Sequence, residues 1–448
     1  MWEMAAWSTR AGQKEANVRE IWSLLIGFSC SNAGEAEVGK KAGLLQNVSR
    51  FSFLALWGRS LIYIWLMLLS LHSYYFHDLG VALFPLAGMV LSVVIVIYFS
   101  ICYPSRLLES LSLSFFPIII ISVFLLVGSV SAFFVEPSIG FSRLVALFFF
   151  AALVMTFSYF RVYHFDSLLS ALRLCLITHL SFFWFQASAH YLGFGFYDFL
   201  EPVTGEAQRV FGGNYNVPFI DRQLIRASGL YSEPGTFATF VFLMYLIYKS
   251  LYYSCRKVGD VFFGWFDVFV VTSVLFSFSV FGFIFTFMYV AFFVLLSLRR
   301  FLVVFPVLVC LSYLIFNIYI YPRFFGGIAT DAGMGFRLEG VSTYFDRVSQ
   351  VPSLLWFGSG FFNDFSIYSP FIVWNDLGLF FSLIMVLGVA GIFGFFVVFC
   401  CCLGGFRLYD FLLLFFVLLS KISVSMALFW MVVSTLFGKK IAIVKLTR

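Results

Sequence analysis

The chain has 448 residues, of which 62% are hydrophobic and only 11% are charged. Soluble globular domains contain about 45–50% apolar and about 25% charged residues. The composition therefore excludes soluble enzymes, disordered proteins, disulfide scaffolds and nucleic-acid binders, and it indicates a protein whose outer surface faces lipid. The formal net charge is +6, but the positions of the charges are more informative than their sum.

Residues 1–50 precede the first long apolar run, and we expect them to form a cytoplasmic tail. Their one short apolar run, Ile21–Phe28, starts late and no small-residue cleavage site follows it, so a signal peptide is not expected. The alternative is that the sequence is overextended at its start, so that residues 1–50 are not part of the native protein.

Apolar runs of about 20 residues, the length that crosses a hydrocarbon core of roughly 30 Å, recur through the rest of the chain. They predict transmembrane helices 1–5 within residues 51–192, helices 6–9 within 237–321, and helices 10–12 with a cytoplasmic C-terminus within 377–448. The clearest runs lie at about 55–75, 81–101, 112–134, 142–160, 170–192, 237–254, 261–278, 280–298, 301–321 and 377–400.

The last apolar stretch, about 410–437, is too long for one span. Lys421 and Ser423 lie in its middle and predict a tight hairpin of two helices. A β-barrel would need short segments in which apolar and polar residues alternate, whereas runs such as FPIIIISVFLLVG are apolar throughout. The expected fold is therefore an all-α polytopic membrane protein with about twelve transmembrane helices.

Lys and Arg positions predict the orientation of the spans, because cytoplasmic loops carry an excess of these residues. Both termini are then cytoplasmic, and two long loops, 193–236 and 322–376, lie on the opposite side. The basic residues assigned to the cytoplasmic side are Lys40, Lys41, Arg50, Arg106, Arg161, Arg256, Lys257, Arg299, Arg300, Arg407, Lys439 and Lys440.

The two long outer loops each contain three Arg and no Lys, although the chain has nine Lys. Arg presents a planar, permanently charged fork that binds phosphate or carboxylate through two hydrogen bonds. We therefore expect an anion site, the alternative being that these Arg pair with the ten acidic residues of the loops on a solvated face. The six residues are Arg209, Arg222, Arg226, Arg323, Arg337 and Arg347.

Residues 222–237 of the first loop have the sequence RQLIRASGLYSEPGTF. Arg222 and Arg226 are spaced i, i+4, so a helical turn would place both guanidinium groups on one face. Ser232 is a natural N-cap, with Glu233 in the first turn of the next span. The N-terminus of that helix would face the loop and favour an anion such as a pyrophosphate. Glu233 could act as a base or hold an Arg in place; an ordinary capped helix start with an ion pair is the alternative.

Residues 337–350 of the second loop are expected to be helical, which would place Arg337 and Arg347 roughly on one side. FGSGF at 357–361 is a glycine-containing turn that lacks the strand and the Lys of a phosphate-binding P-loop. WNDLGLFF then opens the next span, with Asn375 near its N-cap.

RASGLYSEPGTFATF, followed about 120 residues later by R…FGSGFF…ND-G…GVAGIFGF, resembles the O-antigen polymerase (Wzy) and O-antigen ligase superfamily. Members of that superfamily carry an R-x-x-G-x-x-x-E/D-P motif that leads into a span, and later a loop helix that ends in a G-x-G turn. The resemblance covers about Arg222 to Gly394. It implies a membrane-embedded glycosyltransferase of the C-type architecture, which takes a glycan from undecaprenyl pyrophosphate on the periplasmic face of the bacterial inner membrane.

The resemblance also implies roles for individual residues. Arg222 and Arg226, with Arg337 or Arg347, would bind the pyrophosphate and stabilise it as the leaving group. Glu233 matches the acidic position of the motif and would accept the proton of the acceptor hydroxyl or orient the site. No metal or other cofactor is expected, because the outer loops lack a DxD pair or a His/Cys cluster. The residues expected to bind pyrophosphate or glycan are Arg209, Arg323, Arg337, Arg347, Tyr231 and Asn375.

The two enzymes of the superfamily differ in the acceptor. A polymerase transfers the glycan to another lipid-linked repeat unit, and a ligase transfers it to lipid A–core. Ligases typically carry a His before the last Asn-containing helix start, where this chain has VWND, and no His occurs between residues 191 and 448. The polymerase is therefore favoured, with His190 as a geometric substitute for the missing base, although a lone His at a helix end is more often structural.

A flippase for the lipid-linked oligosaccharide is the non-enzymatic alternative. Transporters tend to show two similar halves and charges near the bilayer centre, whereas residues 55–240 and 241–437 show no internal repeat. A purely structural subunit would leave the Arg-only loops unexplained. The partners implied for a polymerase are the undecaprenyl-pyrophosphate-linked oligosaccharide, membrane lipid, a chain-length regulator and a flippase, but no nucleic acid.

Overall fold

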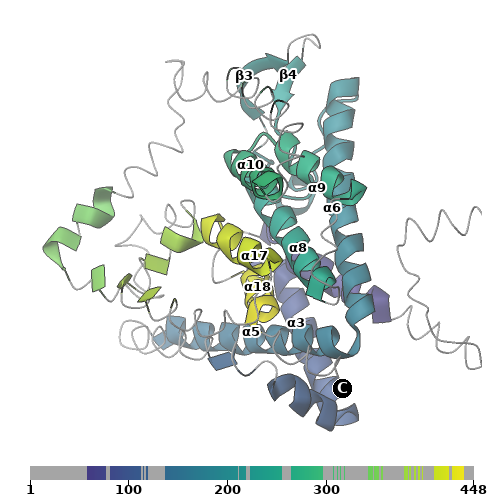
Figure 1. Ribbon diagram of the computed structural model, residues 1–448, viewed down its shortest axis with the longest axis vertical. Coiled ribbons are helices and arrows are strands. Elements are labelled where there is room, and N and C mark those ends of the chain that lie inside the picture. Colours follow the sequence, from purple (N-terminus) through teal and green to yellow (C-terminus); the bar gives the residue numbers. More distant parts are fainter. Residues whose placement is uncertain are drawn as a thin grey trace, which may run out of the picture. The chain divides into compact units, whose positions relative to one another are not determined.

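The computed structural model describes residues 58–76, 81–112, 137–209, 211–217, 222–254, 264–295, 408–422 and 426–437, with isolated positions between 115 and 119 and short stretches between 306 and 396. These residues are mainly helical, and the strands among them form two small antiparallel sheets (Figure 1). From Leu61 onward they belong to one compact unit. The elements are β1 (Tyr75–Phe76), β2 (Val81–Ala82), α3 (Leu83–Cys102), α5 (Pro137–Tyr163), α6 (Phe165–Leu192), α7 (Glu201–Thr204), β3 (Phe211–Val217), β4 (Arg222–Ile225), α8 (Pro234–Ser254), α9 (Trp265–Phe276), α10 (Val280–Leu295), α17 (Leu408–Leu419) and α18 (Ala427–Phe437).

Four helices within the described residues are long and apolar enough to cross a membrane: α3, the Val145–Tyr163 part of α5, α6 and α8. They confirm the long apolar helices predicted near 81–101, 142–160, 170–192 and 237–254. Shorter apolar helices occupy several other predicted spans: Gly58–Ser70, Trp265–Phe276, Val280–Phe292, Leu408–Leu419 and Ala427–Phe437. The spans predicted at 112–134, 301–321 and 377–400 fall mainly on residues outside the described ranges.

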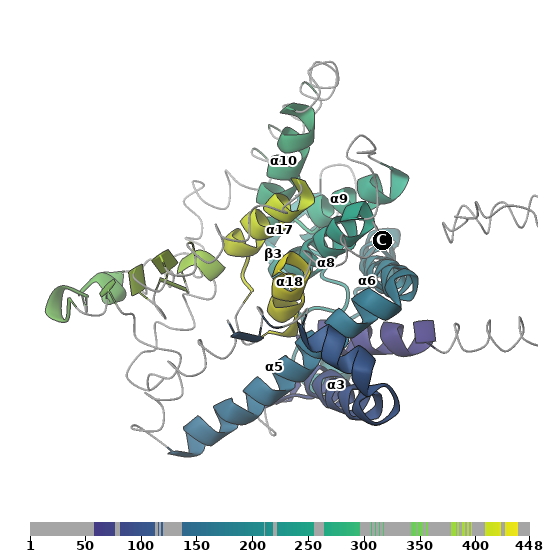
Figure 2. The same cartoon turned by 60° about the horizontal axis from the view of Figure 1, so that its bottom comes forward.

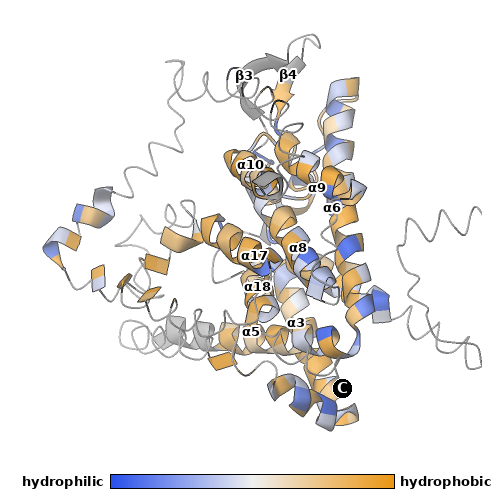
Figure 3. Cartoon of the chain, viewed as in Figure 1, coloured by the Kyte–Doolittle hydropathy of each residue, from blue (hydrophilic) through white to orange (hydrophobic). Residues whose placement is uncertain are grey.

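The helices expose apolar side chains in a way that suits lipid. On α3, Val94, Ile97 and Ile101 leave 54%, 54% and 76% of their surface exposed. Hydrophobic residues, drawn in orange, occur along all the long helices, and on α6 and α8 they alternate with hydrophilic residues drawn in blue (Figure 3). Soluble monomers rarely expose contiguous apolar patches of this kind, so the exposed faces are compatible with a bilayer as solvent.

Helix α8 is the most enclosed of the four long helices. In the most apolar 18-residue segment of α8, 78% of the residues are buried, whereas in the corresponding segment of α3 only 28% are buried. It packs against α6, α9, α10, α17 and α18, and Figure 2 shows α17 and α18 beside it. A helix that is largely apolar and surrounded by other helices forms the core of a bundle, so α8 is the central helix of the group that it forms with α6, α9, α10, α17 and α18.

Two glycines allow neighbouring helices to approach closely. A Cβ on Gly88 of α3 would lie 2.8 Å from Leu69 Cδ2, and a Cβ on Gly282 of α10 would lie 2.4 Å from the Val274 carbonyl oxygen of α9. Both distances are shorter than a van der Waals contact. The turn between α9 and α10 is tight for the same reason, and within it Phe278 takes a left-handed conformation with φ of 48°.

The last apolar stretch is divided into α17 and α18, as the sequence predicts from Lys421. Ser420 ends α17, and its N–H and hydroxyl both donate to the Val417 carbonyl oxygen, at 3.2 and 2.7 Å. Helix α17 packs along α8, and at its first turn Asp410 accepts a hydrogen bond of 2.6 Å from Ser250 of α8. Each of the two helices is shorter than the roughly 20 residues that cross a bilayer.

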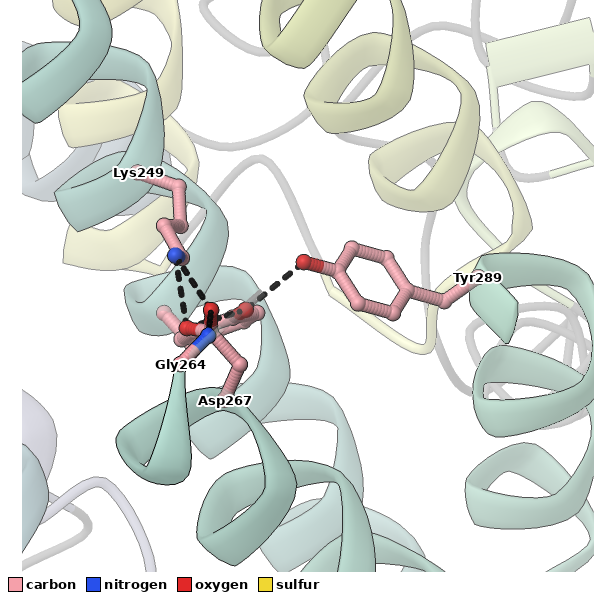
Figure 4. A network of polar contacts seen from close by, with 5 residues as sticks. Lys249, Gly264, Asp267 and Tyr289 are labelled. Carbon is pink, nitrogen blue, oxygen red and sulfur yellow. Dashed lines mark hydrogen bonds and ion pairs between the residues drawn. The ribbon is translucent and has the colours of Figure 1, made fainter. Parts of the chain in front are cut away.

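A buried polar network joins α8 to α9 and α10 at the end of α8 that contains Lys249 (Figure 4). Lys249 Nζ lies 2.6 and 2.7 Å from the two carboxylate oxygens of Asp267. The hydroxyl of Tyr245 donates to Asp267 at 2.9 Å and lies 2.6 Å from the hydroxyl of Tyr289, while the Gly264 N–H donates to Asp267 at 2.8 Å. The carboxylate is therefore paired with one charge and two further donors, which offsets the cost of its burial.

Replacing Lys249 with Met is expected to lower the free energy of unfolding by about 3–5 kcal/mol, because it leaves Asp267 charged, buried and without its counter-ion. The measurement is the thermal unfolding midpoint of the purified protein in detergent. The double variant Lys249→Met/Asp267→Leu should recover much of the loss, since both charges are then absent. A Lys249→Met protein that unfolds at the wild-type temperature would show that the pair is unimportant for stability.

Candidate functional site

The candidate site lies where α8 begins. Pro234 is the first residue of α8, and the carbonyl of Glu233 accepts a 3.1 Å hydrogen bond from the Phe237 N–H. Glu233 is thus the capping residue, one position later than the predicted cap at Ser232. The Ser232 carbonyl instead accepts a 2.8 Å hydrogen bond from the Arg209 N–H. Pro suits the first helical position because an N–H there would have no acceptor within the helix, so its absence in Pro costs nothing.

The carboxylate of Glu233 is paired with Lys421, which comes from the turn between α17 and α18. Lys421 Nζ lies 3.0 Å from Glu233 Oε1, and the Thr236 hydroxyl donates to the same oxygen at 3.3 Å. The lysine side chain is 11% exposed and its Nζ lies 5.5 Å from the centre of the Phe281 ring, whereas the glutamate side chain is 32% exposed. The pair is therefore anchored in the protein on the lysine side and open to solvent on the glutamate side.

The charges around Glu233 determine its ionisation. Burial raises the pKa of this carboxyl, but the charge and hydrogen bond of Lys421, the hydroxyl of Thr236 and the charge of Arg209 together lower it by more. The net pKa of Glu233 lies below its ordinary value of 4.5. At neutral pH the group is a carboxylate, so it can accept a proton.

The chain that follows the second long loop reaches the same place. The Leu379 N–H donates a 2.7 Å hydrogen bond to the Ser420 carbonyl, next to Lys421. Gly378 has a left-handed φ of 116°, and a Cβ there would lie 3.2 Å from the Leu419 carbonyl oxygen. Only glycine adopts this conformation without strain. Gly378 and Leu379 therefore lie against the backbone just before Lys421, and Lys421 in turn contacts Glu233.

The predicted helical turn at Arg222 and Arg226 is wrong. Arg222–Ile225 is strand β4, which pairs antiparallel with β3, with Val217 opposite Arg222 and Asn216 opposite Gln223. Pairing with a partner strand satisfies the backbone groups that a helix would have satisfied internally. Arg226 follows the strand and is half-buried, and Arg209 is exposed.

A buried glutamine on α6 holds the loop of residues 226–233, hereafter the motif loop. Gln186 is fully buried, and its Oε1 accepts hydrogen bonds from the N–H groups of Ser228 and Gly229, at 2.9 and 3.0 Å. Its Nε2 donates to the Tyr197 carbonyl at 2.8 Å and to Gln208 Oε1 at 2.7 Å. Two donor and two acceptor positions are used, so this amide is fully satisfied.

Gln208 completes the arrangement from the other side of the loop. Its Nε2 donates to the carbonyls of Gly229 and Tyr231, both at 2.7 Å, and its own N–H donates to the Asp198 carboxylate at 2.6 Å. Gly229 has a φ of 57°, and a Cβ there would lie 3.1 Å from the Phe183 backbone nitrogen. The glycine and the two amides together fix the backbone that leads to Glu233.

The other predicted site residues have different placements. Tyr231 is fully buried and its ring packs against His179, Phe237 and Phe240. Its ring therefore presents no exposed face on which a sugar could stack. For Arg222 the structure describes only the backbone. Four predicted residues fall outside the described ranges: Arg323, Arg337, Arg347 and Asn375.

An apolar pocket of about 420 Å³ lies between α6, β4 and the turn that joins α9 to α10. Its walls include Phe183 and Trp184 of α6, Ile225 and Ala227 on either side of Arg226, and Phe278. The Trp184 side chain is fixed by a 2.8 Å hydrogen bond from its Nε1 to Ser273 Oγ. A pocket of this size and lining suits an apolar chain or ring.

Lys421, Gln186 and Gln208 are absent from the set of predicted site residues. The signal for Lys421 is present in the sequence, because it is the one charged residue between Asp410 and Lys439, and such residues are functional candidates in membrane proteins. Across the described part of the chain, no group of three or more His, Cys, Asp or Glu side chains is placed to hold a metal ion. No protein-family model, curated protein or solved structure matches this chain.

Replacing Gln208 with Ala should loosen the motif loop, because the carbonyls of Gly229 and Tyr231 lose their buried donors at a cost of about 1–3 kcal/mol. Hydrogen exchange measured by mass spectrometry is expected to accelerate in residues 197–209 and 226–233 and to stay unchanged in α5. Glu201→Ala, an exposed change on α7, is the control. Unchanged exchange in the motif loop would contradict the role of Gln208.

Proposed function

We propose that this chain is a polymerase of O-antigen or a related surface polysaccharide, in the bacterial inner membrane. It would transfer the growing glycan from undecaprenyl pyrophosphate to the non-reducing end of another lipid-linked repeat unit. The proposal includes about twelve transmembrane helices of C-type glycosyltransferase architecture, with the site on the periplasmic face. The observation that carries it is the pairing of Glu233 with Lys421 at the start of α8, because Glu233 is the acidic residue of the motif that resembles the polymerase and ligase superfamily.

The charges at the site suit an anionic donor. Arg209 and Lys421 both act on Glu233, which leaves one positive charge in excess of the carboxylate. Arg226, which follows β4 between the pocket-lining residues Ile225 and Ala227, carries a further positive charge. The backbone N–H groups at the first turn of α8 add a positive dipole end. A pyrophosphate that leaves during the reaction would be stabilised by this excess of positive charge.

The proposed chemistry is a direct transfer. The acceptor hydroxyl oxygen forms a bond to the anomeric carbon, and the bond from that carbon to the pyrophosphate oxygen breaks. The pyrophosphate leaves with the bonding electron pair, and Glu233 takes the hydroxyl proton. A carboxylate that is ionised at neutral pH and partly open to solvent is in the form needed to accept this proton.

The apolar pocket supports a lipid-linked donor. It is lined by the residues on either side of Arg226, so an apolar chain in the pocket would place an attached charged group close to the motif loop. Such a combination of apolar walls with a few polar groups at one end is typical of ligand sites. A soluble nucleotide-sugar donor would have no use for it.

The test is a deletion of the gene in its native host, followed by electrophoresis of the surface polysaccharide. A single-repeat band should replace the ladder of bands, and wild type but not Glu233→Gln should restore the ladder, because the amide cannot accept the proton. Glu201→Gln, an exposed acid of the same loop, should restore it fully. Lipid-linked polymer with bare core would indicate a ligase, and repeat units trapped on the cytoplasmic leaflet would indicate a flippase; either result would overturn the polymerase.

The pocket gives a second test. Ala187→Phe fills part of the space between α6 and β4 and should reduce polymer about tenfold, since about 1.4 kcal/mol of lost donor binding corresponds to that factor. Val203→Phe adds the same ring on exposed α7 and should have no effect. Gel filtration of both proteins checks that they fold. Equal polymer from the two variants would exclude the pocket from donor binding.

A further inference from the structure

We propose that Lys421 is a positioning residue for Glu233, and that the last pair of helices thereby forms part of the site. This inference rests on the proposed function. Lys421 contacts the carboxylate that would take the proton, at 3.0 Å. It acts through Glu233, and no reacting atom needs to touch it.

The backbone around Lys421 is fixed on both sides. The preceding residue, Ser420, accepts the Leu379 N–H at 2.7 Å through its carbonyl and the Ile422 N–H at 3.3 Å through its hydroxyl. Ile422 is fully buried. The ammonium group lies near the Phe281 ring of α10, a contact that favours a cation in that place. Lys421 is thus held at the start of α8 by elements other than α8 itself.

The exposure of the two partners distinguishes a positioning role from a folding role. The more of an ion pair is exposed, the less the pair contributes to stability, because water and salt screen it. Glu233 is 32% exposed, whereas the carboxylate of the Lys249–Asp267 pair is only 3% exposed. The Lys249 pair therefore serves the fold, and the Lys421 pair holds an accessible carboxylate in one orientation.

The groups that face Glu233 come from several elements. Among the described residues, the charged groups that act on it are Lys421 from the α17–α18 turn and Arg209 from the first loop, and Thr236 of α8 supplies a hydroxyl. Ser279, in the turn before α10, lies close to Gly235 together with Glu233 Oε1 and Lys421 Nζ. Removal of Lys421 would leave Arg209 as the remaining charge in this set.

The groups around Glu233 shift its pKa in opposite directions. Burial raises the pKa of Glu233, and Lys421 is the largest influence that lowers it. Without Lys421, the pKa of Glu233 should rise, so that the carboxyl takes up a proton at a higher pH. A side chain that only filled space at position 421 would leave this titration unchanged.

The experiment measures the protonation of Glu233 in the full-length protein in lipid nanodiscs. The carboxyl is activated with a water-soluble carbodiimide in the presence of glycine ethyl ester across a pH series, and mass spectrometry quantifies the loss of the unmodified Glu233 peptide, which counts both the ester adduct and any amide formed with Lys421. In Lys421→Met, half-labelling should occur at a proton concentration about tenfold lower than in wild type, which corresponds to one pKa unit. Lys421→Arg keeps the cation and should titrate close to wild type, and Arg209→Gln should shift less than Lys421→Met.

The same variants are then tested for polymer in the deletion host. Lys421→Met should reduce polymer about tenfold or more, because the carboxylate is then no longer held in one orientation, and Lys421→Arg should retain most of it. Identical titration of Glu233 in wild type and Lys421→Met would overturn the positioning role, and so would full polymer from Lys421→Met. If wild type makes no polymer while the titration still shifts, the proposed function fails and the pairing stands. If Lys421→Met does not fold, Lys421→Gln, which keeps a polar end without the charge, replaces it in both measurements.

Discussion

The structure depends on one constraint: a polar group enclosed among apolar helices must find its partner within the protein, because neither lipid nor a packed core supplies one. Helix α8 meets this constraint at both of its ends. Lys249 pairs with Asp267 at one end, and at the other end the enclosed ammonium group of Lys421 pairs with the more exposed carboxylate of Glu233. Helix α17 takes part at both ends, since Asp410 bonds Ser250 of α8 and the turn after α17 supplies Lys421. Polar contacts thus join α8 to α17 and to the turn that follows α17, one near each end of α8.

The candidate site is assembled from short segments that are far apart in sequence. The motif loop is held by side-chain amides, Gln186 and Gln208, and the strand pair before it extends only to Ile225. Side-chain bonds of this kind fix individual carbonyl and N–H groups, and they leave the adjoining carboxylate accessible. Catalytic sites require this combination, because a preorganised polar environment does not have to rearrange during the reaction.

The sequence predicts the features that depend on local composition. The long apolar helices follow from runs of about 20 residues, and the break between α17 and α18 follows from one charged residue. The β3–β4 pair could not be predicted in this way, because its stability comes from bonds between two strands and RQLI has no decisive periodicity. The partner of Glu233 was also out of reach: a single sequence does not show which of nine Lys will approach a given acid. Segments 193–236 and 322–376 contain Arg and no Lys, so their composition predicts that Arg side chains form the site. The cation that contacts Glu233 is instead Lys421, from another part of the chain.

The break at Lys421 also has a consequence for how the chain is made. Glu233 precedes Lys421 by 188 residues, so during synthesis the glutamate emerges from the ribosome long before the lysine. Helices α17 and α18 are short and have a charged residue between them, which makes each a poor candidate for independent insertion. If the chain inserts into a bilayer as proposed, the two helices would enter as a hairpin and bring Lys421 to a counter-charge that is already in place. The order of synthesis would then favour a late closing step, in which this hairpin docks against the helices that precede it.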